Sequence, residues 1–325
     1  MRNITVLTVL VIILTSVSAV QAQETEKYAL SATPRYGMFF GQAEEIVYTD
    51  GTTPYFMRSQ LLWDIETFCY YGLELHYAQI DPFREWGFFS DLSLKSAAPS
   101  RSGSMADRDW RSVANTNLTD YSFHENYIDQ IYLIDWNAGL SFPFRSMFLL
   151  KAKLVLSYIH LGFSGKNGYG VYAPSYGNGY FGDISEGYAN PHFFYGNVIS
   201  YSQDWLIGAA GASFGVKFLQ NFFFEAGCNI SPLIMCVALD FHITTQDQFN
   251  DYLLFGLYIE PHAALTYTLN KWLSISLDAS YRTIVNTRGV DYVRNLGIGS
   301  DFASGGESGA GLRMLDTGLS LTVRF

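Results

Sequence analysis

The last seven residues, Leu319-Ser-Leu-Thr-Val-Arg-Phe325, alternate strictly between apolar and polar side chains. Because successive side chains of a β-strand point to opposite faces, this stretch would place its apolar residues on one face and its polar residues on the other. That arrangement is typical of a transmembrane β-barrel strand, which contacts lipid on one side and the barrel interior on the other. The C-terminal stretch therefore predicts a membrane strand.

The same alternation recurs through the chain. Residues 273–282 read Leu-Ser-Ile-Ser-Leu-Asp-Ala-Ser-Tyr-Arg, and residues 132–142 and 86–95 follow the pattern less strictly. Beyond the N-terminal segment there is no apolar run of about 18 residues that could form a spanning helix. Because hydrocarbon cannot satisfy an open sheet edge, the strands must close into a barrel.

The composition agrees with this class. Aromatic residues make up 17% of the 325 residues and charged residues only 15%, as expected for a barrel with aromatic girdles at both membrane interfaces. The net charge of -10 argues against a nucleic-acid partner.

Residues 1–22 are predicted to be a secretion signal. Arg2 supplies the positive start, Ile4 to Leu14 form a short apolar core, and Ala22 is the small residue expected at a cleavage site. A membrane anchor is less favoured, because this core is shorter than the roughly 20 residues that a span needs. The mature barrel would then comprise residues 23–325.

The three cysteines are not expected to form a disulfide or to have a redox or metal role. Cys228 and Cys236 fall in one predicted strand, at a separation far beyond disulfide reach, and Cys69 lies in another strand.

Counting the alternating runs predicts an all-β, ten-stranded antiparallel up-and-down barrel that projects above the outer membrane. Short turns alternate with long Gly/Ser/Tyr/Asn-rich stretches near 101–126, 169–194 and 291–312, with shorter ones near 49–54 and 244–251, as periplasmic turns alternate with extracellular loops. An even number of strands places both termini on the periplasmic side. The strands are expected near 27–48, 55–80, 86–100, 127–142, 147–168, 195–219, 222–243, 252–269, 272–290 and 314–325.

Two polar pairs at the upper ends of predicted strands could carry chemistry. Asp107 and Asp109 are two residues apart, so an extended backbone aims both carboxyl groups the same way, and one pKa of such a pair should rise. Asp240 and His242 have the same spacing, and the carboxylate could orient the imidazole as a general base. Facing each other across the barrel mouth, the two pairs could hold and deprotonate a water.

In four patches, taken in order, the chain resembles the omptins, a family of ten-stranded outer-membrane endopeptidases. Gly103-Ser-Met-Ala-Asp-Arg-Asp-Trp110 is similar to the family's Gly-Asn-Met-x-Asp-x-Asp-Trp, and Thr119-Asp-Tyr-Ser-Phe-His124 is similar to its Thr-Asp-x-Ser-x-His. Asp240-Phe-His242 stands where the family has Asp-x-His, and Gly41–Tyr48 resembles a fourth segment.

The resemblance implies peptide-bond hydrolysis with water as the nucleophile and without an acyl-enzyme. It implies Asp107, Asp109, Asp240 and His242 as the catalytic residues of an aspartic-type (Asp/His) endopeptidase that faces the exterior and acts on extracellular polypeptides. Five further residues would bind or support the substrate: Glu45, Met105, Asp120, Ser122 and His124.

Two departures from the family pattern limit what the resemblance implies. Glu45 matches one of two acids that hold a basic side chain before the cut, but Ala238 replaces the other, so the preference for basic residues is weakened. Tyr158-Ile-His160-Leu-Gly162 keeps only the tyrosine of the family's lipopolysaccharide-binding pattern Tyr-x-Glu-x-Arg.

We expect no cofactor beyond the catalytic water, although an outer-membrane lipid could act as an activator, and we expect a monomer.

Three alternatives stay open at this stage. Asp107, Asp109, His124 and His242 could bind a divalent metal, and Ser122 with His124 could form a serine nucleophile. A non-catalytic barrel, such as an adhesin that uses the loop at 169–194, is the alternative from a different class. A wide pore is not expected, because side chains largely fill a ten-stranded barrel.

One local conflict concerns the strand that carries Asp240 and His242. Counted upward from Phe222, its even-numbered positions look lipid-facing, and both site residues share that parity. A β-bulge must intervene, and Pro232, which cannot donate a ladder hydrogen bond, marks a place for it.

Overall fold

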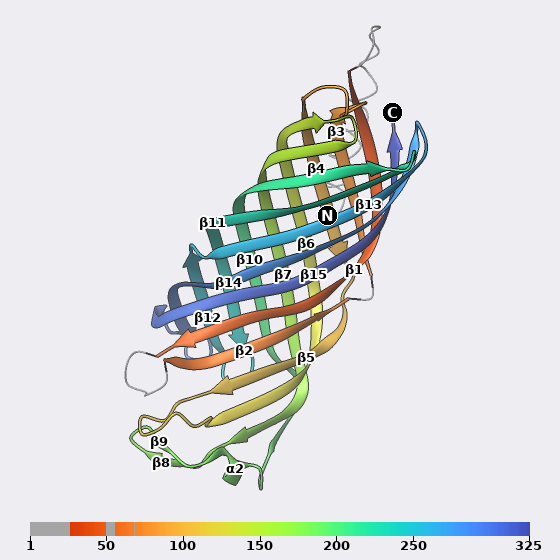
Figure 1. Ribbon diagram of the computed structural model, residues 1–325. Helices are drawn as coiled ribbons and strands as arrows, with labels where there is room; N and C mark the ends of the chain where they lie inside the picture. Colours follow the sequence, from red (N-terminus) through yellow and green to blue (C-terminus); the bar gives the residue numbers. More distant parts are fainter. Residues whose placement is uncertain (1–26, 50–55, 68) are drawn as a thin grey trace.

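The structure is a computed structural model that describes residues 27–49, 56–67 and 69–325, so the predicted signal segment lies outside the described residues. Most of the described residues belong to one antiparallel sheet (Figure 1). The sheet closes because β1 (Tyr28–Tyr48) pairs with β15 (Ala303–Arg324). Within the described residues, no helix has the length and apolar character needed to cross a membrane.

In the described part of the chain, ten long strands form the wall of the barrel. Three of these ten are interrupted, so that each consists of two shorter strands. The interrupted ones are β2 (Met57–Glu66) with β3 (Tyr70–Gln79), β4 (Gly87–Ala97) with β5 (Ser100–Asp109), and β12 (Asp247–Leu254) with β13 (Leu257–Asn270). The others are β1, β6 (Asp120–Phe144), β7 (Phe148–Tyr172), β10 (His192–Phe218), β11 (Phe222–His242), β14 (Leu273–Asn295) and β15. Each pairs with the next in chain order, which confirms the predicted up-and-down barrel.

The two ends of the barrel differ as the sequence predicts. Short turns follow β3, β6, β10 and β13 at the end where β1 begins and β15 finishes. The longer connections lie at the other end, where the segment between β7 and β10 carries β8 (Ser175–Gly177), β9 (Tyr180–Phe181) and α2 (Ile184–Gly187) (Figure 1).

Two of the three predicted long loops are mostly strand, which corrects the expected boundaries. Residues 101–126 contain the upper parts of β5 and β6, and residues 291–312 contain the ends of β14 and β15. Strands of 25 residues in β6 and β7 far exceed the roughly 9–11 residues that cross a bilayer. Above the membrane both faces of the sheet meet water or polar groups, so these parts have a loop-like composition without the alternating pattern.

The predicted bulge in β11 is present. Gly208 of β10 pairs with Leu233, but Ala210 pairs with Ile230, so two residues of β11, Ser231 and Pro232, oppose one of β10. Ile230 is exposed below the bulge, whereas Leu233 is exposed above it. The shift reverses the parity of the strand and turns Asp240 toward the interior.

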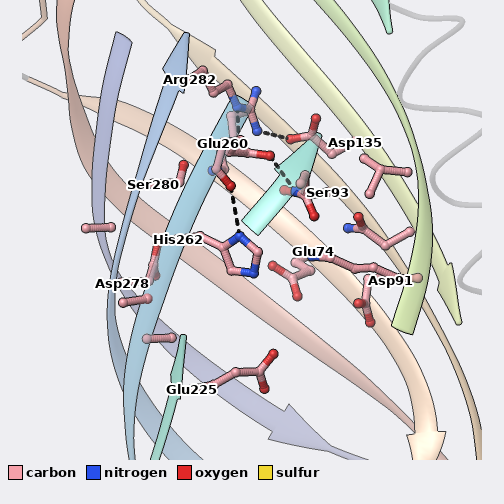
Figure 2. A pocket seen from close by; sticks show the side chains of 18 of the residues that line it. Glu74, Asp91, Ser93, Asp135, Glu225, Glu260, His262, Asp278, Ser280 and Arg282 are labelled. Carbon is pink, nitrogen blue, oxygen red and sulfur yellow. Dashed lines mark hydrogen bonds and ion pairs between the residues drawn. The ribbon is translucent and has the colours of Figure 1, made fainter. Parts of the chain in front are cut away.

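At membrane depth the interior is held together by buried ion pairs. The Arg282 guanidinium lies 2.6 Å from Asp135 and 2.8 Å from Glu260, and Asn229 donates to Glu260 at 2.6 Å (Figure 2). Because each charge has a partner of opposite sign on another strand, the network ties β6, β13 and β14 together.

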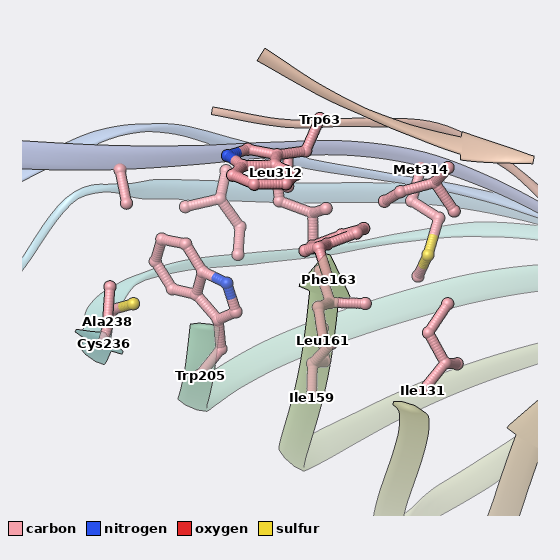
Figure 3. Packing of buried hydrophobic residues seen from close by; sticks show 14 of the residues in the cluster. Trp63, Ile131, Ile159, Leu161, Phe163, Trp205, Cys236, Ala238, Leu312 and Met314 are labelled. Carbon is pink, nitrogen blue, oxygen red and sulfur yellow. The ribbon is translucent and has the colours of Figure 1, made fainter. Parts of the chain in front are cut away.

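An apolar layer fills the barrel above this polar network (Figure 3). Trp63 stacks on Tyr201 and on Phe163, with ring centroids 5.5 Å apart in both pairs, and Trp205 is fully buried. The layer forms the base on which the polar groups at the mouth lie. The three cysteines are free, as expected from their positions.

Candidate active site

The mouth of the barrel holds a cavity of about 290 Å³ that is lined by an arc of neighbouring strands. In the order in which they pair, these strands are β5, β2, β1, β15, β14, β12 and β11. Asp107 and Asp109 line the cavity from β5, at one end of the arc, and Asp240 and His242 line it from β11, at the other end. Side chains that are 133 positions apart in sequence (107 to 240 and 109 to 242) therefore meet above the membrane.

Asp107 and Asp109 belong to β5, and the register explains their common direction. Asp107 pairs with Leu61 and Asp109 pairs with Ser59, both on β2. The Ser59 hydroxyl donates to Asp107 Oδ1 at 3.4 Å, so it anchors the carboxyl pair from the neighbouring strand.

Asp240 and His242 form a direct contact on β11. The Nε2 atom of His242 lies 2.7 Å from Asp240 Oδ2. The Phe249 ring packs edge-on against the imidazole, with centroids 5.4 Å apart. These two contacts fix the plane of the imidazole and leave Nδ1 as the nitrogen that could accept a proton from the cavity.

The two carboxyl groups of β5 resist ionisation. Burial raises the pKa of Asp107 well above its usual value, the neighbouring Asp109 charge adds to this, and the His242 charge opposes it. Burial also raises the pKa of Asp109, while the Ser59 hydroxyl and Arg111 oppose that rise. The pair therefore favours retention of a proton, as the sequence spacing predicts.

His242 is shifted toward its charged form. Burial opposes the charge, but Asp240, through its charge and its hydrogen bond, together with Asp107 and Asp109, raises the pKa of His242 to about 9. The imidazole and the carboxyl groups interact strongly, so they exchange protons as one network.

Four residues that the resemblance assigns to substrate binding do not line this cavity. They are buried in the wall of the barrel: Met105, Asp120, Ser122 and His124. Asp120 accepts from Arg111 Nε at 2.6 Å and from the Thr119 hydroxyl at 2.7 Å. Their burial fits a role in supporting β5 and β6, and their part in substrate binding stays a prediction.

Ser122 and His124 form a pair of their own. The Ser122 hydroxyl lies 3.0 Å from His124 Nε2, and His124 Nδ1 lies 2.5 Å from the carbonyl oxygen of Asn167. Burial lowers the pKa of His124, and the nearby His242 charge adds to this, so the ring favours its neutral form. Both side chains are buried, and neither lines the cavity at the mouth.

The alternative metal site has no matching geometry. Within the described part of the chain, one set of three metal-type side chains has ligand atoms within 4.8 Å of one another: Glu74, His76 and Asp91. Asp107, Asp109, His124 and His242 are not such a set. Glu74 already accepts from Arg35 at 2.7 Å, so an ion pair accounts for it.

Sequence reasoning missed two acids of the cavity, Asp251 of β12 and Asp291 of β14. They pair directly with each other across the two strands. The sequence around each of these two acids looks like a polar loop. They are 40 residues apart, and they become neighbours only through the register in which β12 pairs with β14. Ser59 was missed for the same reason.

The comparisons with known proteins agree with this architecture. The omptin family matches residues 26–325, and no curated protein matches the sequence. Among solved structures, the outer membrane protease OmpT from Escherichia coli is similar, with a TM-score of 0.78 and 15% identity over 94% of this chain and 100% of that chain. The translocator domain of the autotransporter NalP from Neisseria meningitidis has a TM-score of 0.38 at 10% identity, over 100% of this chain and 98% of that chain.

The fold and the family match together define an outer-membrane β-barrel of the protease class, with its site facing the cell exterior. The chain belongs to the omptin family, of which it is a divergent member.

Proposed function

We propose that the protein is an endopeptidase that cleaves extracellular polypeptides with a water activated between Asp107/Asp109 and Asp240/His242. The observation that carries this proposal is the convergence of both pairs on one cavity at the barrel mouth. A peptide could enter this cavity from the exterior and reach Asp107, Asp109 and His242, which are half-buried.

The proton balance of the site fits hydrolysis. Neutral His242 takes a proton from the water through Nδ1, while its Nε2–H donates to Asp240. The water oxygen attacks the peptide carbonyl carbon, and the proton held by the Asp107/Asp109 pair moves to the carbonyl oxygen. His242 then protonates the departing amine as the carbon–nitrogen bond breaks, and the pair recovers its proton.

Water is the better nucleophile candidate than Ser122. The serine and its histidine are buried in the wall, and neither lines the cavity. The imidazole that does line the cavity, that of His242, has a carboxylate as its hydrogen-bond partner. No acyl-enzyme is expected from this arrangement.

Glu45 would contact the substrate beside the catalytic pairs. Its carboxyl group is 3% exposed and lines the same cavity. Burial raises its pKa well above the usual value, and the charges of Asp240, Asp251 and Asp107 add to this. A cation would therefore be favoured next to it, but Ala238, on β11, supplies no second charge.

The test is cleavage of a peptide library by the mature barrel refolded in detergent, compared with Asp109→Ala and His242→Ala. Loss of about 10²-fold or more in kcat/KM in both variants is expected for removal of a general acid or base. Asp129→Asn, which changes an exposed acid on β6, is the matched control. Equal cleavage by all four proteins would contradict the proposal, and cleavage by none would favour the adhesin alternative.

A further inference from the structure

In the described part of the chain, three strands complete the barrel mouth opposite the arc that lines the cavity. They are β6, β7 and β10, which pair in this order between β5 and β11. The two proposed catalytic pairs lie on β5 and β11, so β7 is the middle one of the three strands that separate them. A polar side chain on the inner face of β7 would therefore face a peptide held at both pairs.

The upper end of β7 presents Tyr172 to this side of the mouth. Tyr172 pairs with Asp120 of β6, and Asp120 pairs with Asp109 of β5. Residues that pair directly in an antiparallel sheet have their side chains on the same face, so Tyr172 faces the interior as Asp109 does. Val171 points the other way: it is fully buried next to α2, where a Cβ on Gly187 would lie 2.9 Å from Val171 Cγ1.

The ring of Tyr172 folds back along β7 over Gly170. A Cβ added at Gly170 would lie 2.5 Å from the Tyr172 hydroxyl oxygen and 2.8 Å from the Cζ atom of its ring. Gly170 has no positive φ, so the strand does not need a glycine there for its backbone conformation. The missing side chain instead leaves the space that the phenol occupies.

This position of the ring brings the hydroxyl level with Asp107. Gly170 pairs with Ser122 of β6, and Ser122 pairs with Asp107 of β5. The hydroxyl and the Asp107 carboxyl group thus belong to one row of the sheet, whose backbones there are two strand spacings or about 10 Å apart. The short side chain of Ser122 stands between them in this row. A carbonyl oxygen that lies between the two groups could contact both.

The Tyr172 hydroxyl is available to donate a hydrogen bond. The side chain is 45% exposed, and within the described part of the chain no residue accepts from its hydroxyl. Partial burial raises the pKa of this hydroxyl to about 12, and the charges of Asp107, Asp120 and Asp109 add to the rise. Asp107 contributes more than Asp120, the direct partner of Tyr172, which agrees with a hydroxyl in the row of Asp107. The phenol therefore keeps its proton near neutral pH.

We propose that the Tyr172 hydroxyl donates a hydrogen bond to the carbonyl oxygen of the scissile peptide bond, next to the Asp107/Asp109 pair, and is thus a further catalytic residue. This inference rests on the proposed endopeptidase function and adds a donor to its mechanism. Negative charge develops on the carbonyl oxygen as water attacks the carbon, so a donor there stabilises the transition state more than the planar substrate. The proton that the oxygen receives still comes from the Asp107/Asp109 pair, and the phenol keeps its own.

The test removes the hydroxyl and keeps the ring. Tyr172→Phe, refolded in detergent, should lower kcat at least about tenfold on the peptide that the wild type cleaves fastest, with KM changed less than about twofold. Tyr195→Phe removes the hydroxyl of a tyrosine that is 86% exposed on β10, and this matched control should retain the wild-type rate. Heat-dependent gel mobility gives the folded fraction to which each rate is referred.

A tetrahedral inhibitor separates a catalytic role from a structural one. A peptide whose scissile amide is replaced by a hydroxyethylene group carries a hydroxyl on a tetrahedral carbon in place of the attacked carbonyl. Tyr172→Phe should weaken inhibition by this peptide at least about tenfold. Binding of the intact substrate, measured in Asp109→Asn proteins with and without Tyr172→Phe, should change less than about twofold. Equal weakening of both ligands would mean that the fold is disturbed, and would overturn the proposal.

Gly170→Ala tests the placement of the hydroxyl. The added Cβ would push the phenol out of the row of Asp107, so kcat should fall about as far as in Tyr172→Phe. The double variant should lose little more than Tyr172→Phe alone, because both changes remove the same hydrogen bond. Losses that multiply would mean that Gly170 acts independently of the hydroxyl, and would contradict this placement.

The rates also separate this inference from the proposed function. Asp109-dependent cleavage that Tyr172→Phe leaves at the wild-type rate would retain the endopeptidase and overturn the role of Tyr172. Absence of cleavage by the wild type on every peptide of the library would overturn the endopeptidase, and with it the assignment of Tyr172.

Discussion

The imidazole of His242 lies 2.7 Å from the carboxylate of Asp240, and this contact sets the pKa of the proposed base. Its pKa is about 9, so at neutral pH most of the free protein carries a charged imidazole. The neutral form that can accept a proton becomes more populated as the pH rises toward 9. We expect kcat/KM to rise with pH over this interval, and to fall at higher pH when the Asp107/Asp109 pair loses its proton.

Asp240→Asn should shift the rising part of the pH–rate profile, which follows the deprotonation of His242, to lower pH. The substitution removes the charge that raises the pKa of His242 and leaves a neutral amide oxygen as a weaker hydrogen-bond acceptor, while burial, which lowers the pKa, remains. The maximal rate should also fall by at least about tenfold, because a neutral amide holds and stabilises the imidazole less well than a carboxylate does. A pH–rate profile measures both effects, and a rising part that does not shift would show that another group controls it.

The second prediction concerns the carboxyl pair on β5. Asp107→Asn and Asp109→Asn should each lower kcat by about 10²–10⁴-fold with little change in KM, since the pair acts on the reacting carbonyl. The double variant should cost no more than the worse single variant, because the two groups share one proton. Steady-state kinetics on one peptide decides this, and additive losses would argue for separate roles.

The third prediction concerns the bulge at Ser231 and Pro232. Deletion of Pro232 restores regular pairing and would turn Asp240 and His242 toward the outer face of the barrel, away from the cavity. We expect activity to be lost, whereas Pro232→Ala, which keeps the residue count, should retain it. Heat-dependent gel mobility would report the folded fraction of each variant. Full activity of the folded deletion variant would contradict the parity argument.

The fourth prediction concerns stability and pH. Asp251 has a folded-state pKa of about 8 against a usual value of 3.8, so the folded state holds a proton that the unfolded chain releases. Asp251 therefore lowers the free energy of unfolding. This effect is absent below the pKa that Asp251 has in the unfolded chain, and it grows as the pH rises toward 8. Asp251→Asn should therefore be more stable than the wild type at pH 8, and equal to it near pH 4.

Urea unfolding in detergent across this pH range measures the difference. A variant less stable than the wild type at pH 8 would mean that Asp251 has a structural role. The expected exchange of stability for function is common at binding sites.

The fifth prediction concerns Arg282 at membrane depth. Arg282→Ala leaves Asp135 and Glu260 without their shared partner, and this should lower the free energy of unfolding by about 3–5 kcal/mol. Lys271→Ala, in the exposed turn before β14, is the matched control for loss of a cation. Similar unfolding midpoints for the two variants would show that the network contributes little.

The membrane part of the barrel could be predicted from the sequence because its signal is local. Each membrane strand has lipid on one face and the side chains of the barrel interior on the other, so its residues alternate between apolar and polar. Leu319 to Phe325 show this alternation in the sequence itself, before any contact between strands is known. The same alternation exposed the conflict at Asp240 and located the bulge beside Pro232. Above the membrane the alternation disappears, and the upper parts of β5, β6 and β14 therefore looked like loops.

The site could be predicted only in part. Asp107/Asp109 and Asp240/His242 have a local spacing that carries chemical meaning, and the structure brings the two pairs to one cavity. Asp251 and Asp291 have no such spacing, because their relation is a strand register. Met105, Asp120, Ser122 and His124 belong to matching motifs, but a motif does not say which of its side chains face the cavity.

The apolar layer around Trp63, Phe163 and Trp205 has a consequence for the cell as a whole. It fills the lumen between the cavity at the mouth and the periplasmic end of the barrel, so we expect that solutes and peptides do not pass inward through the barrel. A cell could therefore carry many copies of this protein on its surface without weakening the permeability barrier that the envelope provides.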